Sequence, residues 1–406
     1  MQKSNITHAA IVPLIGGMAL GQERAFGSRP DYILSYEPFK NNDAQLLAYY
    51  KKRDGDDIPY YLLDKGQKHP HQVDVVAALC PCAGLSSLSG HASSDSAMND
   101  WMLESAKYVL GEMKPQVFWG ENAPGFAGKI GQPVVAKLRK TAKENGYILS
   151  MYRTRTLLHG GPQVRERSFY FFWRGDQVPL LNYFNKQGPT IEEVILLVKP
   201  DALQQDVITN PAKPSDDPFY RFVLDEIHGG ITHNQFSKKI SLTANVMSHI
   251  EESGITYDKV AKWCKKQKLD KLADKCMRVH AKLTAGGSVM RHVTTIPKLR
   301  IGAFVGHLPT KLTHPRNDRY LSVRECMTIM GLPADFELID PKRQLNHICQ
   351  NVPVDTAADA AGEVRAVLEG KRDHISGNLI CQFNAKRNWT DLDDTPEVVA
   401  NLESFI

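Results

Sequence analysis

The chain has 406 residues, a formal net charge of +5 and seven cysteines, and 42% of its residues are hydrophobic. This length allows two domains or one large one, each with a buried core. No uncharged run approaches membrane-spanning length, and the first residues lack the apolar segment of a signal peptide, so no membrane association is expected. An odd cysteine count without framework spacing indicates a reducing compartment. The modest positive charge permits a polyanionic partner without requiring one.

The first part of the chain predicts a strand, a glycine turn and a helix. Residues 9–15 are apolar and end at Gly16 and Gly17, and a helical pattern follows over residues 18–25. This is how α/β folds present backbone amides to a nucleotide-like ligand, although any tight turn also favours glycine. A second apolar stretch ends at Glu37, where an acidic residue suits ribose hydroxyls or simply lies in a solvated loop.

The stretch around Cys82 is the strongest single candidate for chemistry. Residues 73–79 are apolar and rich in β-branched side chains, which predicts a buried parallel strand. Small residues after it begin a loop, so Cys82 is expected just beyond the carboxyl end of that strand, where α/β sheets bind ligands. Cys82 is then either an inert buried thiol or a nucleophile. A metal site built on Cys80 and Cys82 lacks a second pair of ligands, so no metal is predicted.

Two later strands also carry polar residues. Residues 116–122 predict a strand that ends near Glu121, and a carboxylate beside an apolar strand can have a raised pKa and donate a proton. Residues 163–173 predict a strand on which three hydrogen-bonding side chains share one face: Gln163, Arg165 and Arg167. These groups need anionic or carbonyl partners unless the strand is a solvated edge.

The composition changes after residue 174. Prolines gather in residues 211–218 and lysines in residues 259–268, which suggests a second, inserted and partly basic domain. Its lysines are either a solvated helix face or a phosphate-contacting surface with Trp263 available to stack on a base.

Helical patterns return near the end of the chain. One covers residues 322–331, with Ser322 and Glu325 forming a capping box, and another covers residues 355–368.

Five separate motifs, in this order, resemble those of the DNA (cytosine carbon-5) methyltransferase family. They are Pro81-Cys82-Ala83-Gly84-Leu85-Ser86, Glu121-Asn122-Ala123, Gln163-Val164-Arg165-Glu166-Arg167, Leu321-Ser322-Val323-Arg324-Glu325 with Gly331-Leu332-Pro333, and His347-Ile348-Cys349-Gln350-Asn351-Val352-Pro353. Each motif alone is weak, but their order and spacing fit together. The resemblance covers about residues 8–174 and 288–369, and the region between them falls where the family has its variable target-recognition domain.

The resemblance implies an α/β fold, namely a Rossmann-like sheet of the S-adenosylmethionine-dependent methyltransferases with an inserted smaller target-recognition domain. Residues 1–174 and 289–371 would form the catalytic domain, residues 175–288 the target-recognition domain, and residues 372–406 a C-terminal extension without a family counterpart. It also implies a monomer that acts on double-stranded DNA in the cytoplasm or on the nucleoid, as restriction–modification enzymes do.

The resemblance assigns the chemistry to four residues. Cys82 would add as a thiolate to carbon-6 of a flipped cytosine, which lets carbon-5 attack a methyl group. Glu121 would protonate or hydrogen-bond ring nitrogen 3, while Arg165 and Arg167 would hold the carbonyl side and Glu121. The expected DNA contacts are Ser86, Gln163, Lys262, Lys265 and Lys266.

The methyl donor implied by the resemblance is S-adenosylmethionine. Its expected contacts are Ile15, Gly16 and Gly17 for the methionine part, Glu37 for the ribose, Asp57 and Ile58 for the adenine, and Pro81, Asn351 and Val352 around them. Residues 12–15 replace a phenylalanine, which stacks on adenine in the family, and an extra glycine. Residues 349–351 replace glycine, asparagine and a small residue, although Gln350 offers the same amide group.

These departures leave two interpretations of the pocket. Either S-adenosylmethionine binds more weakly than usual, or the pocket suits a modified donor or is completed by DNA. An RNA cytosine methyltransferase and an inactive DNA-binding homologue are further alternatives. The intact Cys82 and Glu121 count against an inactive protein, and the long middle region favours duplex DNA over RNA by analogy.

Overall fold

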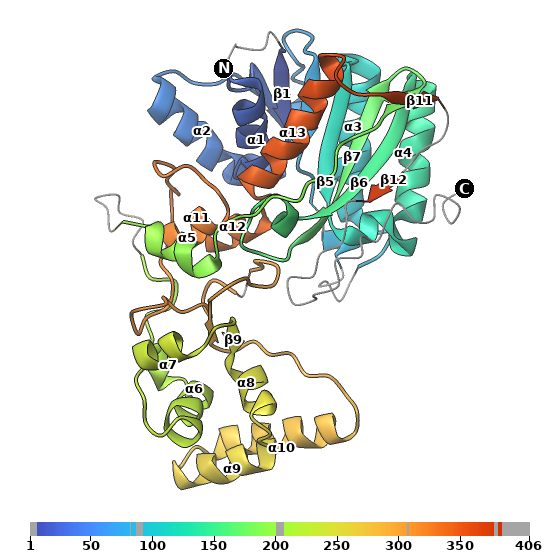
Figure 1. The fold of residues 1–406 in the computed structure, drawn as a ribbon. Coiled ribbons are helices and arrows are strands. Elements are labelled where there is room, and N and C mark those ends of the chain that lie inside the picture. The colour runs from blue at the N-terminus through green and yellow to red at the C-terminus, as the bar shows by residue number, and fades with distance from the viewer. Residues whose placement is uncertain are drawn as a thin grey trace. The chain divides into compact units, whose positions relative to one another are not determined.

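The computed structural model describes residues 6–81, 83–86, 92–199, 207–306, 308–376 and 381–383. The chain divides into two compact units, which Figure 1 draws in one view. The larger unit consists of Met1–Gly188, Met330–Ile339 and Gln350–Ile406, and the smaller of Pro189–Ile329 and Asp340–Cys349. These bounds differ from the predicted boundaries at residues 175 and 288. The predicted roles of the two parts stay predictions.

An eight-stranded sheet forms the centre of the larger unit, in the order β12-β6-β7-β5-β4-β1-β2-β3. All neighbouring strands are parallel except β7, which is antiparallel to both β5 and β6. The strands are β1 (His8–Ile11), β2 (Tyr32–Ser35), β3 (Tyr60–Leu62), β4 (Val75–Ala78), β5 (Val117–Asn122), β6 (Tyr147–Arg155), β7 (Glu166–Arg174) and β12 (Cys381–Phe383). The sequence prediction of an α/β fold with a mainly parallel sheet is confirmed.

Helices connect these strands, as parallel pairing requires. They are α1 (Gly17–Phe26), α2 (Lys40–Asp54), α3 (Asp100–Tyr108), α4 (Gln132–Glu144) and α13 (Val354–Leu368). Helix α13 lies against α1 (Figure 1), and a Cβ atom on Gly21 would be 2.5 Å from the Ala357 Cβ, so only glycine allows this approach. Within the described ranges, no helix is both long and apolar enough to cross a membrane.

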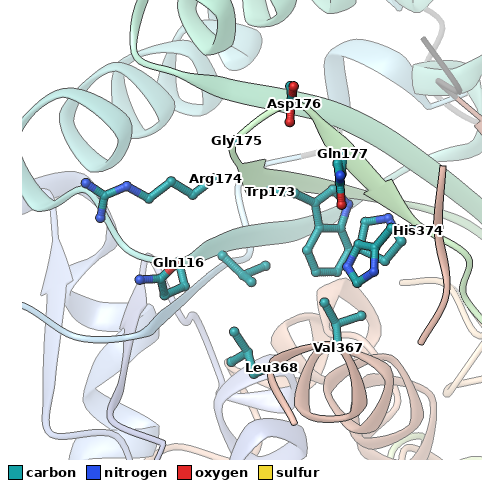
Figure 2. A pocket seen from close by; sticks show the side chains of 11 residues that line it. Gln116, Trp173, Arg174, Gly175, Asp176, Gln177, Val367, Leu368 and His374 are labelled. Carbon is teal, nitrogen blue, oxygen red and sulfur yellow. The ribbon is translucent and has the colours of Figure 1, made fainter. Parts of the chain in front are cut away.

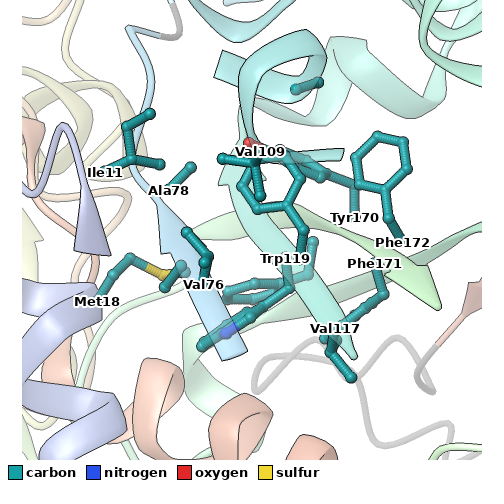
Figure 3. Close-up of a cluster of buried hydrophobic side chains, with 14 of the residues drawn as sticks. Ile11, Met18, Val76, Ala78, Val109, Val117, Trp119, Tyr170, Phe171 and Phe172 are labelled. Atoms are coloured by element: carbon teal, nitrogen blue, oxygen red, sulfur yellow. The ribbon is translucent and has the colours of Figure 1, made fainter. Parts of the chain in front are cut away.

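Aromatic pairs across β5 and β7 fill the core beneath the site. Phe118 pairs in register with Phe172, and Trp119 with Phe171, and each pair stacks with ring centroids 5.4 and 5.8 Å apart, respectively. Because successive side chains point to opposite faces, the two stacks fill both sides of the sheet. Figure 3 shows this cluster with Val76 and Ala78 of β4 beside it. The packing fixes β5 and β7 relative to each other, and with them the residues at their ends.

The region after residue 372, for which no counterpart was expected, contributes two strands. Strand β11 (His374–Ser376) pairs with β8 (Gln177–Pro179), and β12 pairs in parallel with β6. Since β6 would otherwise be an edge strand, β12 covers its exposed backbone groups.

The smaller unit is mainly helical. Its elements are α5 (Ile191–Leu197), α6 (Pro218–Phe222), α7 (His233–Lys239), β9 (Ala244–Asn245), α8 (Val246–Glu252), α9 (Tyr257–Lys266), α10 (Asp270–Thr284), β10 (Thr295–Ile296) and α11 (Val323–Ile329), and α12 (Leu345–Gln350) ends where the chain returns to the larger unit. The predicted capping box is present: Glu325 N–H donates to Ser322 Oγ at 3.2 Å, and Ser322 N–H donates to Glu325 Oε2 at 2.8 Å.

Candidate active site at the carboxyl edge of the sheet

Glu121 and Arg167 form a buried ion pair at the end of β5 and the start of β7. Glu121 is the penultimate residue of β5 and is 2% exposed, and the Arg167 Nε contacts its Oε1. Burial raises the pKa of Glu121, although the positive charges of Arg167 and then Arg165 act in the opposite direction. The carboxyl group is therefore easier to protonate than an exposed glutamate, as a proton donor requires.

Arg165 lies beside this pair but has a different partner. It is 2% exposed, and its Nη2 donates to the backbone carbonyl of Asn351 at 3.0 Å. The predicted strand from residue 163 is wrong at its start, because β7 begins at Glu166. Gln163 and Arg165 are therefore held by the loop before β7 rather than by strand alternation. Both side chains are nevertheless buried, and the Gln163 Nε2 lies 3.4 Å from the Met330 Sδ.

The chain that follows β4 carries the two candidate cysteines. Cys82 lies outside the described residues. Cys80 is buried, and burial raises the pKa of its thiol to about 12, against hydrogen bonds to Ser105 and Tyr170 that lower it. A thiol with this pKa is almost wholly protonated at neutral pH, so Cys80 is a poor nucleophile. Pro81 and Ser86, on either side of Cys82 in the chain, are both half-buried.

The loop after β1 meets the closing motif of the chain. The Gly17 N–H donates to Asn351 Oδ1 at 2.8 Å. A Cβ atom on Gly17 would lie 2.1 Å from the Val352 carbonyl oxygen, so this contact requires glycine. Gly16 has φ of 101°, a conformation that side chains disfavour, and it precedes the first turn of α1 without a side-chain cap. The structure thus brings together four residues that the resemblance assigns to the cofactor, namely Gly16, Gly17, Asn351 and Val352.

Of the two neighbouring amide side chains, Asn351 makes this contact. Gln350 is exposed at the end of α12, whereas Asn351 is buried and bonds to Gly17. Among the described residues, Asn351 Nδ2 is a buried donor without a hydrogen-bond partner. A ligand carrying a carboxylate or another acceptor would satisfy this donor.

The residues expected to contact the ribose and the adenine lie at opposite ends of the parallel strands. Glu37 follows the carboxyl end of β2, and its side chain is 46% exposed. Asp57 and Ile58 instead precede β3, and Asp57 pairs with Lys51 at 3.1 Å. Because β2 and β3 are parallel, Asp57 and Ile58 lie at the opposite ends of the strands from Glu37, so the structure does not bring them together with Glu37.

The acidic residue that lies beside Glu37, after the carboxyl end of β3, is Asp64 rather than the predicted Asp57. It follows the carboxyl end of β3, is exposed, and its two carboxylate oxygens each lie 3.1 Å from the Glu37 backbone nitrogen. The available sequence signal is the apolar triplet Tyr60–Leu62 followed by an acidic turn. A three-residue strand is too short for periodicity to detect.

In the smaller unit, the lysine segment forms helix α9. Lys262, Lys265 and Lys266 are exposed, and Lys262 pairs with Asp258 at 3.5 Å. Trp263 is 6% exposed and packs edge-on against Phe222, with ring centroids 5.4 Å apart. The prediction that Trp263 is available to stack on a base is therefore wrong, because it belongs to the core of this unit.

A pocket with a volume of about 250 Å³ lies where β5 begins, at the opposite end of that strand from Glu121. Figure 2 shows Gln116, Trp173 and His374 around it. Trp173 pairs with Val117, the first residue of β5, whereas Glu121 lies four residues further on, which is about 13 Å at the rise of a strand. This pocket is therefore separate from the candidate active site.

The comparisons with known proteins agree with this arrangement. The family described as "C-5 cytosine-specific DNA methylase" matches residues 12–365, so the chain belongs to that family. It is 24% identical over 290 residues to the Type II methyltransferase M.PspPI of Psychrobacter sp. (strain TA137). That match covers 70% of this chain and 62% of the relative's length.

Two solved structures share the fold. One is described as a DNA modification methyltransferase encoded within an E. coli prophage, with a TM-score of 0.54 and 15% identity, covering 90% of this chain and all of the other. The other is the Entamoeba histolytica methyltransferase EhMeth, with a TM-score of 0.51 and 14% identity, covering 90% of this chain and 99% of that one.

Proposed function

We propose that the protein transfers a methyl group to carbon-5 of cytosine in double-stranded DNA. The observation that carries the proposal is the buried Glu121–Arg167 pair, with Arg165 beside it, at the edge of the sheet toward which β4 leads. A carboxyl group with a raised pKa, beside fixed positive charges, suits a base whose ring nitrogen and carbonyl gain negative charge during reaction. Membership of the DNA methylase family supports cytosine as that base.

In the proposed reaction, the Cys82 thiolate adds to carbon-6 of the flipped cytosine. The electron pair of the carbon-5–carbon-6 double bond becomes available at carbon-5, while Glu121 donates a hydrogen bond or proton to nitrogen 3. Carbon-5 then takes the methyl group from the donor sulfonium, whose sulfur keeps the bonding electron pair. A base removes the carbon-5 proton, nitrogen 3 returns any proton it received to Glu121, and the sulfur–carbon-6 bond breaks to restore the ring and the Cys82 thiolate. The inert environment of Cys80 supports Cys82, and not its neighbour, as the nucleophile.

S-adenosylmethionine, when bound, supplies the methyl group. The residues that would hold it are Gly16, Gly17 and Asn351 for the methionine part, with Glu37 and Asp64 for the ribose and adenine. The buried Asn351 amide donor and the close approach of Val352 to Gly17 support this assignment. Asp64 takes the role that the sequence interpretation gave to Asp57 and Ile58.

DNA contacts are proposed for both units. Ser86 and Gln163 would meet the target nucleotide, and the exposed Lys262, Lys265 and Lys266 would contact phosphates. We further propose that the enzyme acts as a monomer.

Trapping of the covalent intermediate tests the proposal. DNA that contains 5-fluorocytosine stalls the reaction, since fluorine cannot leave as a proton, and a stable protein–DNA adduct should form with S-adenosylmethionine. Cys82→Ser should abolish the adduct, while the matched variant Cys80→Ser should retain it. The opposite pattern would refute the assignment. Mass spectrometry of ordinary cytosine substrate should show the addition of one methyl group, and any other mass would favour a modified donor.

A further inference from the structure

Asp43 is a fully buried carboxylate that belongs to none of the motifs. It lies in the first turn of α2 and is 0% exposed. Its Oδ1 accepts the Leu14 N–H at 2.9 Å, and its Oδ2 accepts the Tyr60 hydroxyl at 3.0 Å. The side chain therefore joins the loop after β1 to the first residue of β3. Burying a carboxylate costs free energy, so a buried carboxylate that contacts the loop after β1 is expected to have a specific role.

The loop that Asp43 holds has an unfavourable backbone. Val12 and Leu14 have φ of 50° and 52°, and positive φ is rare for residues other than glycine, most of all for a β-branched one such as Val12. A loop with such angles keeps its shape only if its surroundings hold it.

Helix α2 contacts the same loop at a second point. A Cβ atom on Gly16 would lie 2.5 Å from Leu46 Cδ1, so the Leu46 side chain packs directly against this glycine. Asp43 and Leu46 are three residues apart and lie on one face of the helix. One face of α2 thus supports Leu14 through a hydrogen bond and Gly16 through an apolar contact.

We propose that Asp43 is a positioning residue whose carboxylate holds residues 14–17 in the shape that receives the methionine part of S-adenosylmethionine. The inference rests on the proposed function, because it concerns the same cofactor. Asp43 acts through the backbone of Leu14 and takes no part in the chemistry.

The position of Asp43 makes this support depend on pH. Burial raises the pKa of Asp43 to about 7, against the Ser35 and Tyr60 hydroxyls and the Leu14 N–H, which lower it. These are the groups that face it from β2, β3 and the loop, and the pKa of Tyr60 is itself raised by burial and by Asp43. Above pH 7 the carboxylate accepts a stronger, charge-assisted bond from Leu14, so cofactor affinity should increase as pH rises through this value.

Calorimetry of S-adenosylmethionine binding to the full chain between pH 6 and 8.5 tests the proposal. The affinity of the unaltered protein should rise by about fivefold, the difference between a charged and a neutral hydrogen bond. Asp43→Asn keeps an acceptor for Leu14 but does not titrate, so its affinity should change less with pH. Titration of the cofactor itself affects the unaltered protein and Asp43→Asn equally, so it cancels when their pH dependences are compared. Gln45→Ala is the matched control, because Gln45 is buried on α2 but accepts from Ile339 at 2.8 Å.

Amide hydrogen exchange of residues 12–17 in the free protein provides a second measurement. Exchange should be faster in Asp43→Ala than in the unaltered protein or Gln45→Ala. If exchange changes but the pH dependence of affinity is the same in Asp43→Asn, Asp43 has only a structural role and the proposal is overturned. If the cofactor binds at every pH with no difference among the variants, the proposal fails while the proposed function stands. If no binding occurs with or without DNA, both fail.

Discussion

Replacing Gly17 with alanine tests the contact on which the proposed pocket depends. The added Cβ would lie 2.1 Å from the Val352 carbonyl oxygen and 2.4 Å from Asn351 Oδ1. A backbone carbonyl cannot swing away as a flexible side chain can, so the closing motif must shift. Overpacking of this kind costs about 1–3 kcal/mol, and loss of the Gly17–Asn351 hydrogen bond costs about 1 kcal/mol more. Alanine in a helix recovers about 1 kcal/mol, so we expect a net loss of roughly 1–3 kcal/mol.

The matched control is Gly362→Ala in α13. A Cβ atom there would meet nothing within 4 Å, so this variant should be stabilised by up to about 1 kcal/mol. Urea unfolding followed by circular dichroism measures both variants, and calorimetry measures their affinity for S-adenosylmethionine. Gly17→Ala should lose affinity and Gly362→Ala should not. Equal stability of the two variants, with cofactor binding intact in both, would refute the contact between the glycine loop and the closing motif.

Three further predictions concern charge. Arg167→Ala leaves Glu121 buried without its ion-pair partner, so we expect a loss of about 3 kcal/mol in the free energy of unfolding, most of it recovered in the double variant with Glu121→Gln. Because burial raises the pKa of Glu121 in the folded state, its contribution to stability falls as pH rises from the unfolded value toward the folded one, and Glu121→Gln should flatten that dependence in thermal unfolding. For DNA binding, changing Lys262, Lys265 and Lys266 to glutamine should weaken all sequences alike and reduce the salt slope by about 0.9 for each phosphate that is no longer neutralised. The same change of the exposed Lys137, Lys140 and Lys143 on α4 is the control, and an unchanged slope in the α9 variant would exclude that helix from binding phosphates.

Most of the sheet is predictable from the sequence because its strands are long or strongly apolar. Strands β4 and β5 lie within the predicted ranges 73–79 and 116–122, and their ends differ from the prediction by at most two residues. Glu121 lies at the predicted strand end. Periodicity does not reveal β3, whose three residues are too few, so the acidic residue after this strand, Asp64, is missed and Asp57 is predicted in its place. The prediction for Trp263 fails for a related reason, since a lysine-rich composition hides the apolar face of an amphipathic helix.

Contacts between distant segments cannot be read from composition or spacing. Gly17 and Asn351 are 334 positions apart in the chain, and Arg165 and Asn351 are 186 apart. Sequence motifs identify all three residues, but they assign Gly17 to the cofactor and Arg165 to the cytosine. Their connection depends on how the chain returns from the smaller unit, and this follows from tertiary packing rather than from local pattern.

Asn351 joins the loop after β1 to the arginine beside Glu121. Its side chain accepts a bond from Gly17 of the cofactor loop, and its backbone carbonyl accepts one from Arg165 beside Glu121. Any variant that changes the shape of residues 12–15 would move Gly17, so the closing motif would have to adjust if both bonds are to be kept. Asn351, one of the expected cofactor contacts, makes both of these bonds in the structure. Asn351 thus links the proposed cofactor site to the proposed catalytic arginine through two hydrogen bonds.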